Sequence, residues 1–104
     1  MIHVLAHIVA KPGERARILE IMLANRPAVL AEDGCLGYEP AIDLEGAGPI
    51  QTPLGPDAFM VVERWADLAA LKAHAAAPHM KAYAEATRDL VASRTIHVLT
   101  PDVA

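Results

Sequence analysis

The sequence contains few aromatic residues and a single cysteine. Its 104 residues include one tryptophan, one phenylalanine and two tyrosines, so each ring has to fill a specific place in a small core. Cys35 has no second cysteine in the chain, which excludes an intrachain disulfide and is compatible with a reducing compartment. There is no basic stripe, since the net charge is −4, and no long apolar run of membrane-spanning length. We therefore expect a cytoplasmic protein that binds neither nucleic acid nor a membrane.

Small apolar residues are abundant instead. The hydrophobic fraction is 54%, much of it alanine, and it lies above the usual value for a soluble domain. A chain of 104 residues has the size of a single domain, which we assign to residues 1–104. Apolar content beyond what one small core needs predicts a second hidden surface, and self-association as a homodimer is the simplest way to hide it.

Hydrophobic periodicity and turn residues together predict the elements of this domain. Pro27 is expected to kink or break the first helix, and Pro40 to place its strand at a sheet edge or a bulge. A loop rich in glycine and proline, residues 45–57, joins the second and third strands. The expected strands are 2–10, 35–44, 59–65 and 93–99, and the expected helices are 14–32, 68–75 and 78–92.

The resulting order, β-α-β-β-α-α-β, predicts an α+β fold of the ferredoxin-like type. Right-handed crossovers then give a four-stranded antiparallel sheet with the helices on one face. The strands are apolar on both sides, so the second face would remain in water in a monomer. Two such sheets packed face to face would cover it, which again predicts a dimer.

One stretch, residues 58–80, brings together most of the side chains that could carry chemistry. Trp65 ends a strand, and Asp67 can cap the short helix that follows. His74 and His79 lie on either side of Pro78, which fits the first turn of a new helix. Glu63 lies within a strand expected to be buried, where a carboxylate is unusual.

These residues have structural and functional interpretations. His79, His74 and Glu63 are candidate catalytic bases, but a histidine can also complete a helix end, and a buried glutamate can pair with a basic group. The two histidines are five residues apart, which is not the spacing that puts two imidazoles on one helix face, and no acidic partner is near in sequence, so we expect no metal site. The candidate substrate-binding residues, which could equally be core residues, are Phe59, Trp65, Met80, Tyr83 and Tyr38.

Three segments, residues 33–38, 59–65 and 71–80, resemble the antibiotic biosynthesis monooxygenase (ABM) family, which includes small quinol monooxygenases. The resemblance runs from about Ile2 to Leu99 and implies a dimeric α+β barrel. It also implies oxidation of phenolic or quinol substrates by O2 without metal, flavin or other cofactor. The chain departs from the family in its long 45–57 loop. Ala6 and Ala84 stand where the haem-degrading branch carries an asparagine and the haem-ligand histidine, which disfavours haem cleavage.

The leading functional hypothesis is therefore a cofactor-independent monooxygenase that acts on a small aromatic substrate. A non-catalytic dimeric binding or stress-related domain, and an isomerase or lyase acting on a small metabolite, remain alternatives. The pocket is expected between sheet and helices, and its polarity would discriminate among them. Its expected boundary is Phe59, Trp65, His74, His79, Met80 and Tyr83.

Overall fold

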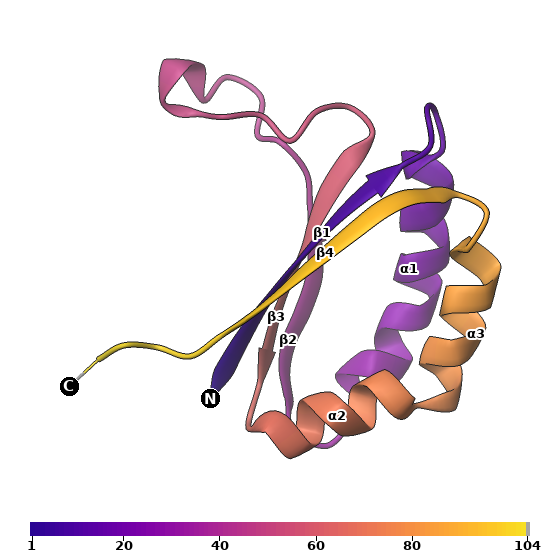
Figure 1. Cartoon of the computed structure of the whole chain (residues 1–104), viewed down its shortest axis with the longest axis vertical. Coiled ribbons are helices and arrows are strands. Elements are labelled where there is room, and N and C mark those ends of the chain that lie inside the picture. Colours follow the sequence, from indigo (N-terminus) through magenta and orange to yellow (C-terminus); the bar gives the residue numbers. More distant parts are fainter. Residues whose placement is uncertain (104) are drawn as a thin grey trace.

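Four antiparallel strands form a twisted sheet, and three α-helices cover one of its faces (Figure 1). The computed structural model describes residues 1–103. The strand order is β2-β3-β1-β4, so the α+β ferredoxin-like fold predicted from the sequence is confirmed. In chain order, the elements are β1 Ile2–Ala10, α1 Arg15–Leu30, β2 Cys35–Ala41, the 3-10 turn η1 Gly48–Ile50, β3 Ala58–Trp65, α2 Leu68–Ala76, α3 Pro78–Thr87 and β4 Val91–Leu99.

Strand β3 shows why this sequence forms a two-faced sheet. Phe59, Val61, Glu63 and Trp65 alternate along it and are all buried beneath the helices, whereas Val62 and Arg64 are exposed on the opposite face. Its antiparallel neighbour β1 continues the same pattern, so both strands contribute alternate side chains to one core. The alternation of side chains along the strands therefore places Phe59, Glu63 and Trp65 on the face that the helices cover.

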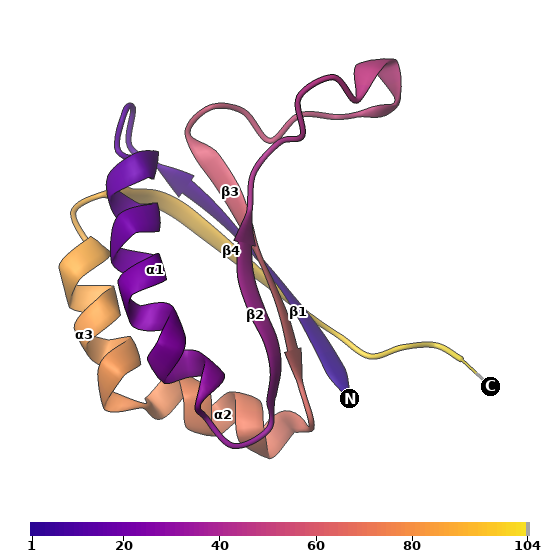
Figure 2. The ribbon, with the colours of Figure 1, turned by 180° about the vertical axis from the view of Figure 1, so that it is seen from behind.

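The helices form a layer in which α1 and α3 lie side by side, while α2 runs across one end (Figure 2). Ile18, Met22 and Val29 of α1 are buried against the sheet. Asp67 caps α2, because its side chain accepts a hydrogen bond from the Ala70 N–H at 2.8 Å. This layer brings the end of α1 close to α2 and α3.

Several predicted element ends differ from those observed. Helix α1 continues through Pro27 to Leu30. The proline removes one intrahelical hydrogen bond, and the last turn is held by the burial of Val29 and by the Ala31 N–H, which donates to the Pro27 carbonyl at 3.2 Å. Strand β2 ends at Ala41 and not at residue 44, and α3 ends at Thr87 and not at residue 92. Pro40 does lie on an edge strand, as expected, since β2 has a single neighbour.

Residues 42–57 leave the sheet as a long loop that projects away from the helices (Figures 1 and 2). The Asp43 carboxylate closes its base by accepting hydrogen bonds from the backbone N–H groups of Leu54 at 2.8 Å and Gly55 at 3.0 Å. These bonds hold the pKa of Asp43 below its ordinary value. The tip is open, and Ile50 is 91% exposed.

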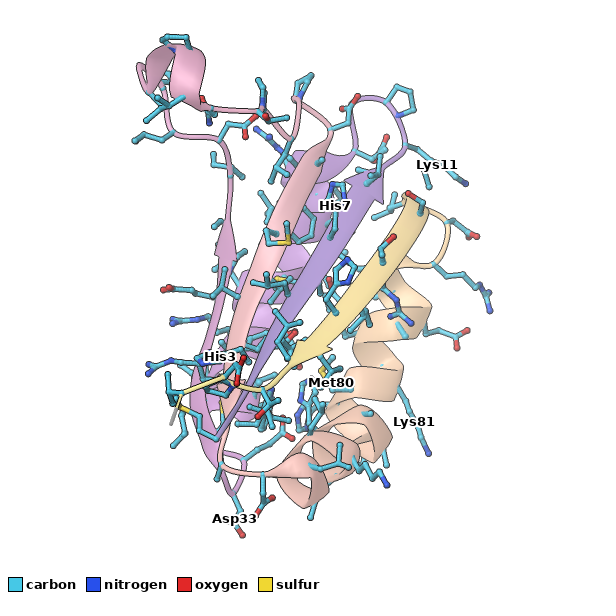
Figure 3. All side chains as sticks on the ribbon, turned by 60° about the vertical axis from the view of Figure 1, so that its left-hand side comes forward. His3, His7, Lys11, Asp33, Met80 and Lys81 are labelled. Carbon is cyan, nitrogen blue, oxygen red and sulfur yellow. The ribbon has the colours of Figure 1, made fainter. Side chains whose placement is uncertain are left out.

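Among residues 1–103, no element covers the sheet face opposite the helices, and Figure 3 turns this face toward the reader. We call it the bare face, and it includes Leu5 and His7 of β1, Val62 of β3 and Leu99 of β4. Val62 and Leu99 are 37% and 45% exposed, and the Nε2 of His7 is buried without a hydrogen-bond partner among residues 1–103. Within the same residues, no helix has the length and apolar character needed to cross a membrane.

Candidate active site

A cavity of about 310 Å³ lies between the helical layer and the sheet. Its lining is mostly apolar, with Glu63 of β3 and His74 of α2 as buried polar side chains. Such a combination, apolar walls with a few polar groups, is typical of sites for small organic ligands. The lining residues include Val4, Ala6, Tyr38, Val61, Glu63, His74, Met80, Tyr83 and Arg94.

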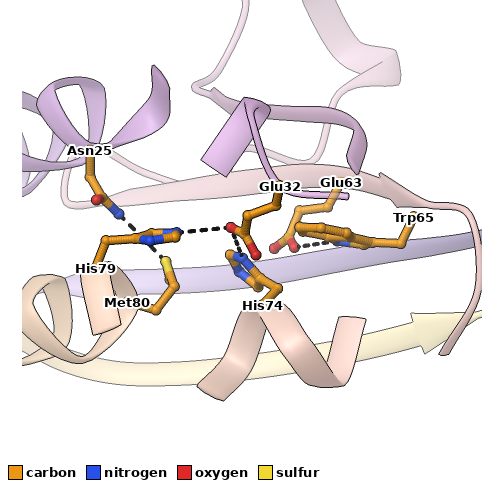
Figure 4. Close-up of polar contacts among 7 residues, drawn as sticks. All are labelled: Asn25, Glu32, Glu63, Trp65, His74, His79 and Met80. Atoms are coloured by element: carbon orange, nitrogen blue, oxygen red, sulfur yellow. Dashed lines mark hydrogen bonds and ion pairs between the residues drawn. The ribbon is translucent and has the colours of Figure 1, made fainter. Parts of the chain in front are cut away.

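Trp65, Glu63 and His74 form a packed group at one side of this cavity (Figure 4). The indole Nε1–H of Trp65 donates a hydrogen bond to Glu63 Oε1 at 3.0 Å. The His74 ring lies 4.6 Å from the Trp65 ring and 5.5 Å from the Tyr38 ring, measured between centroids. The rings of Tyr38 in β2 and Trp65 in β3 therefore restrict the orientation of the His74 imidazole.

Glu32 connects two histidines from different helices (Figure 4). It lies just after α1, and its Oε2 is 2.8 Å from His74 Nδ1 and 2.9 Å from His79 Nε2. An ionised carboxylate only accepts hydrogen bonds, so each of these ring nitrogens carries the hydrogen. We call these residues the Glu32 cluster: Glu32, His74 and His79.

The tautomer of His74 follows from this arrangement. With hydrogen on Nδ1, a neutral imidazole has a lone pair on Nε2. Within residues 1–103, no side chain or backbone group forms a hydrogen bond with that Nε2, and it is not sealed from solvent. His74 therefore lines the cavity with one ring nitrogen held by Glu32 and the other free of protein partners within residues 1–103.

Burial perturbs the other ionisable groups of the cavity. It raises the pKa of the Glu63 carboxyl above its ordinary value, while the Trp65 hydrogen bond and the neighbouring His74 oppose the rise. Burial also raises the pKa of Tyr83 to about 12, and burial together with the nearby Glu63 carboxylate raises the pKa of Tyr38. Both phenols therefore keep their hydrogens at neutral pH and can donate hydrogen bonds to a ligand.

The structure places the predicted site residues at different distances from the cavity. His74, Glu63, Tyr38, Met80 and Tyr83 line it. Three other candidates lie behind this lining. Phe59 is fully buried in the core, Trp65 acts on the cavity through Glu63 and His74, and His79 contacts Glu32.

Sequence reasoning missed Glu32 and Arg94. Glu32 is 42 residues from His74 and 47 from His79 in the chain, so no local spacing links it to either histidine. Only the packing of the α1 end against α2 and α3 reveals the contact. Arg94 comes from β4, at a position opposite Ile8 in the sheet register, and its side chain reaches the cavity wall.

The fold and sequence of the chain are similar to those of a family of small α+β proteins. The family model described as "Antibiotic biosynthesis monooxygenase" matches residues 1–86. The chain therefore belongs to the antibiotic biosynthesis monooxygenase family, as its sequence motifs indicated.

Among known sequences, the chain is similar to "Probable quinol monooxygenase YgiN" of Escherichia coli, with 37% identity over 99% of this chain and 100% of that protein. Among solved structures, it is similar to PA3566 from Pseudomonas aeruginosa, with a TM-score of 0.80, 24% identity and coverage of 98% and 94% of the two chains. Rv0793 from Mycobacterium tuberculosis has a TM-score of 0.79 at 23% identity, with 99% and 96% of the chains covered. These structural likenesses show the shared fold.

Proposed function

We propose that this chain is a cofactor-independent monooxygenase that oxidises a small phenolic or quinol-type substrate with O2. The observation that carries the proposal is His74, which lines an apolar cavity with Nδ1 on a carboxylate and Nε2 unpartnered within residues 1–103. Membership in the antibiotic biosynthesis monooxygenase family and the quinol monooxygenase name of the Escherichia coli relative support the same class of reaction.

His74 is the general base in this proposal. Glu32 holds the hydrogen on Nδ1, so the Nε2 lone pair is available for the phenolic proton of the substrate. Glu32 also stabilises the imidazolium that forms, because a positive ring next to a carboxylate is favoured. This is the same division of labour by which a buried carboxylate orients a catalytic histidine in hydrolases.

The substrate itself supplies the electrons. Loss of the proton gives a phenolate, which transfers one electron to O2; the semiquinone and superoxide radicals then combine to form a carbon–oxygen bond. The peroxide anion so formed takes the proton from the His74 imidazolium, and the resulting hydroperoxide loses water and leaves a hydroxylated quinone. One oxygen atom enters the product and the other leaves as water, so a hydroquinone that loses four electrons needs no external reductant.

The remaining wall orients the ring and excludes water. Val4, Ala6 and Val61 give the cavity an apolar floor, and a dry site strengthens the attraction between His74 and the developing charge. The protonated hydroxyls of Tyr38 and Tyr83 can donate hydrogen bonds to substrate oxygens. Glu63, whose pKa is raised by burial, can accept a hydrogen bond from a second substrate hydroxyl.

The proposal includes a homodimer formed through the bare face. Apolar side chains such as Leu5 and Val62 lie there beside the buried, unpartnered Nε2 of His7. Packing a second sheet against this face would remove them from water. Light scattering should give twice the chain mass of 11.1 kDa, and a monomer at micromolar concentration would contradict the dimer.

Oxygen uptake against a panel of quinols, anthrones and flavonoids tests the activity. With a substrate found, His74→Gln should lower turnover by about 100-fold or more, the scale of losing a general base. Lys72→Gln, an exposed residue of the same helix, is the matched control and should retain turnover. Full turnover in His74→Gln would overturn the assignment of the base, and no uptake with any substrate would favour the binding-domain alternative.

A further inference from the structure

We propose that the Glu32 cluster is a binding site for a divalent transition-metal ion such as Zn²⁺, and that the ion switches off His74 as a base. The site stands on its own geometry, whereas its effect on turnover rests on the proposed function. Three helical segments supply the ligands: Glu32 after α1, His74 in α2 and His79 in α3. Their ligand atoms lie within 4.8 Å of one another.

The distances are close to those a metal ion requires. Glu32 Oε2 is 2.8 Å from His74 Nδ1 and 2.9 Å from His79 Nε2. Around a tetrahedral zinc ion with bonds of about 2.0–2.1 Å, neighbouring ligand atoms are about 3.3 Å apart. Each nitrogen has to move away from the oxygen by about 0.5 Å, and the two nitrogens, which lie within 4.8 Å of each other, have to settle at about 3.3 Å, so binding requires the three side chains to rotate.

The charge of the cluster also favours a cation. Side-chain exposures are 8% for His74, 13% for Glu32 and 27% for His79, so the carboxylate is largely withdrawn from water. Among residues 1–103, no lysine or arginine forms an ion pair with Glu32. A metal ion would replace the two ring hydrogens that now face Oε2 and would neutralise the carboxylate.

The donor set selects the kind of ion. Two imidazole nitrogens and one carboxylate oxygen suit zinc, cobalt, nickel or copper, whereas magnesium and calcium prefer oxygen ligands. Three protein ligands leave a fourth position for water. The partial exposure of His79 gives the ion a route from solvent to the cluster.

Metal binding changes what His74 can do. An imidazole bound to the metal through Nδ1 carries its hydrogen on Nε2, so the lone pair used to accept the substrate proton is lost. Zinc should therefore inhibit turnover, and a chelator should restore it. A metal that served the reaction as a cofactor would have the opposite effect.

Titrations with Zn²⁺ by calorimetry and with Co²⁺ by visible absorption test the site without any substrate. The wild-type chain should bind one ion, and Glu32→Gln and His79→Gln should each weaken binding by more than about tenfold. His97→Gln, a histidine of β4 outside the cluster, is the matched control and should bind as the wild type does. No binding by the wild type, or an equal loss in His97→Gln, would overturn the proposal.

A second measurement uses the wild-type chain alone, so it does not depend on the folding of a variant. Long-range ¹H–¹⁵N spectra distinguish the two nitrogens of each imidazole. Zinc should shift His74 Nδ1 and His79 Nε2 as metal ligands, and the hydrogen of His74 should move from Nδ1 to Nε2. Shifts confined to His3, His7 or His97 would refute the site. If no substrate supports oxygen uptake, the proposed function fails while these binding results still decide the metal site. If zinc binds without inhibiting an established turnover, the switch is refuted.

Discussion

The hydrogen bond from Trp65 to Glu63 should make a measurable, pH-dependent contribution to stability. Trp65→Phe removes the only side-chain donor that contacts the Glu63 carboxylate within residues 1–103, and Glu63→Ala removes the acceptor. After burial and the Trp65 hydrogen bond, the largest influences on the pKa of Glu63 come from His74, which lowers it, and Glu32, which raises it. A double-mutant cycle over the two substitutions isolates the interaction, because the packing lost with the indole is common to both backgrounds.

The expected coupling follows from the burial of both partners. Glu63 is 6% exposed and Trp65 is fully buried, so the bond is protected from water. A hydrogen bond to a charged group is worth about 1.5–3 kcal/mol, and one to a neutral group about 0.5–1.5 kcal/mol. The coupling should therefore be near the higher range at about pH 8 and fall to the lower range once Glu63 is protonated.

The direction of the pH dependence also follows. Burial raises the pKa of Glu63 in the folded chain, so its contribution to stability is fully present below the ordinary value of 4.5 and is lost as the pH rises through the raised value. Removing the Trp65 donor raises this pKa further. Trp65→Phe should therefore lose more stability than the wild type as the pH rises.

Urea unfolding followed by far-UV circular dichroism measures the cycle, since Trp65 is the only tryptophan and its fluorescence disappears with the substitution. Unchanged slopes would show that the unfolded state is comparable in the four proteins. A coupling below about 0.5 kcal/mol at about pH 8, or one that does not change with pH, would refute the reasoning.

Three further predictions concern other parts of the chain. In urea unfolding, Gly34→Ala should destabilise the chain more than Gly13→Ala does. Both residues have φ near +80°, so an alanine costs about 1–2 kcal/mol of backbone strain at either position, but a Cβ at Gly34 would also lie 2.6 Å from Ala70 Cβ, which adds about 1–3 kcal/mol. Equal losses of stability would contradict the clash. Tyr83→Phe should reduce the loss of stability between about pH 10 and 12. The pKa of Tyr83 is raised to about 12 in the folded chain, so the contribution of its phenol to stability is fully present below about pH 10 and is lost as the pH rises through about 12. A free energy of unfolding that falls with pH in the variant as steeply as in the wild type would refute this. Asp43→Ala should speed hydrogen exchange at the backbone amides of Leu54 and Gly55, which donate to the Asp43 carboxylate at 2.8 and 3.0 Å, while the amides of β1 stay protected. Unchanged exchange would show that the base of the loop closes without these hydrogen bonds.

Most of the fold could be predicted because its signals are local. The alternation of Phe59, Val61 and Trp65 needs only neighbouring residues to indicate a two-faced strand, and Asp67 marks the start of α2. The ends of elements were harder. Pro27 remains inside α1, since the burial of Val29 against the sheet offsets the hydrogen bond that the proline removes.

The candidate site was only partly predictable. His74 and Glu63 were identified because a polar residue in an apolar segment is visible in the sequence. Their relation to Glu32 was not, since the contact closes more than 40 residues of chain and depends on where α1 ends. Residue spacing alone therefore argued against a metal site, because it could not show that Glu32 lies beside His74 and His79 in the folded chain.

The sharing of one carboxylate oxygen by His74 and His79 also restricts how this chain can evolve. Replacing any one member of the Glu32 cluster leaves a hydrogen-bonding group without its partner in a poorly solvated place, at a cost of about 1–3 kcal/mol. Natural proteins lie only slightly above the stability that function needs, so selection should remove a chain with such a single change. We expect the three positions to be inherited as a unit and to be lost together, although strands β2 and β3 lie between Glu32 and His74 in the chain.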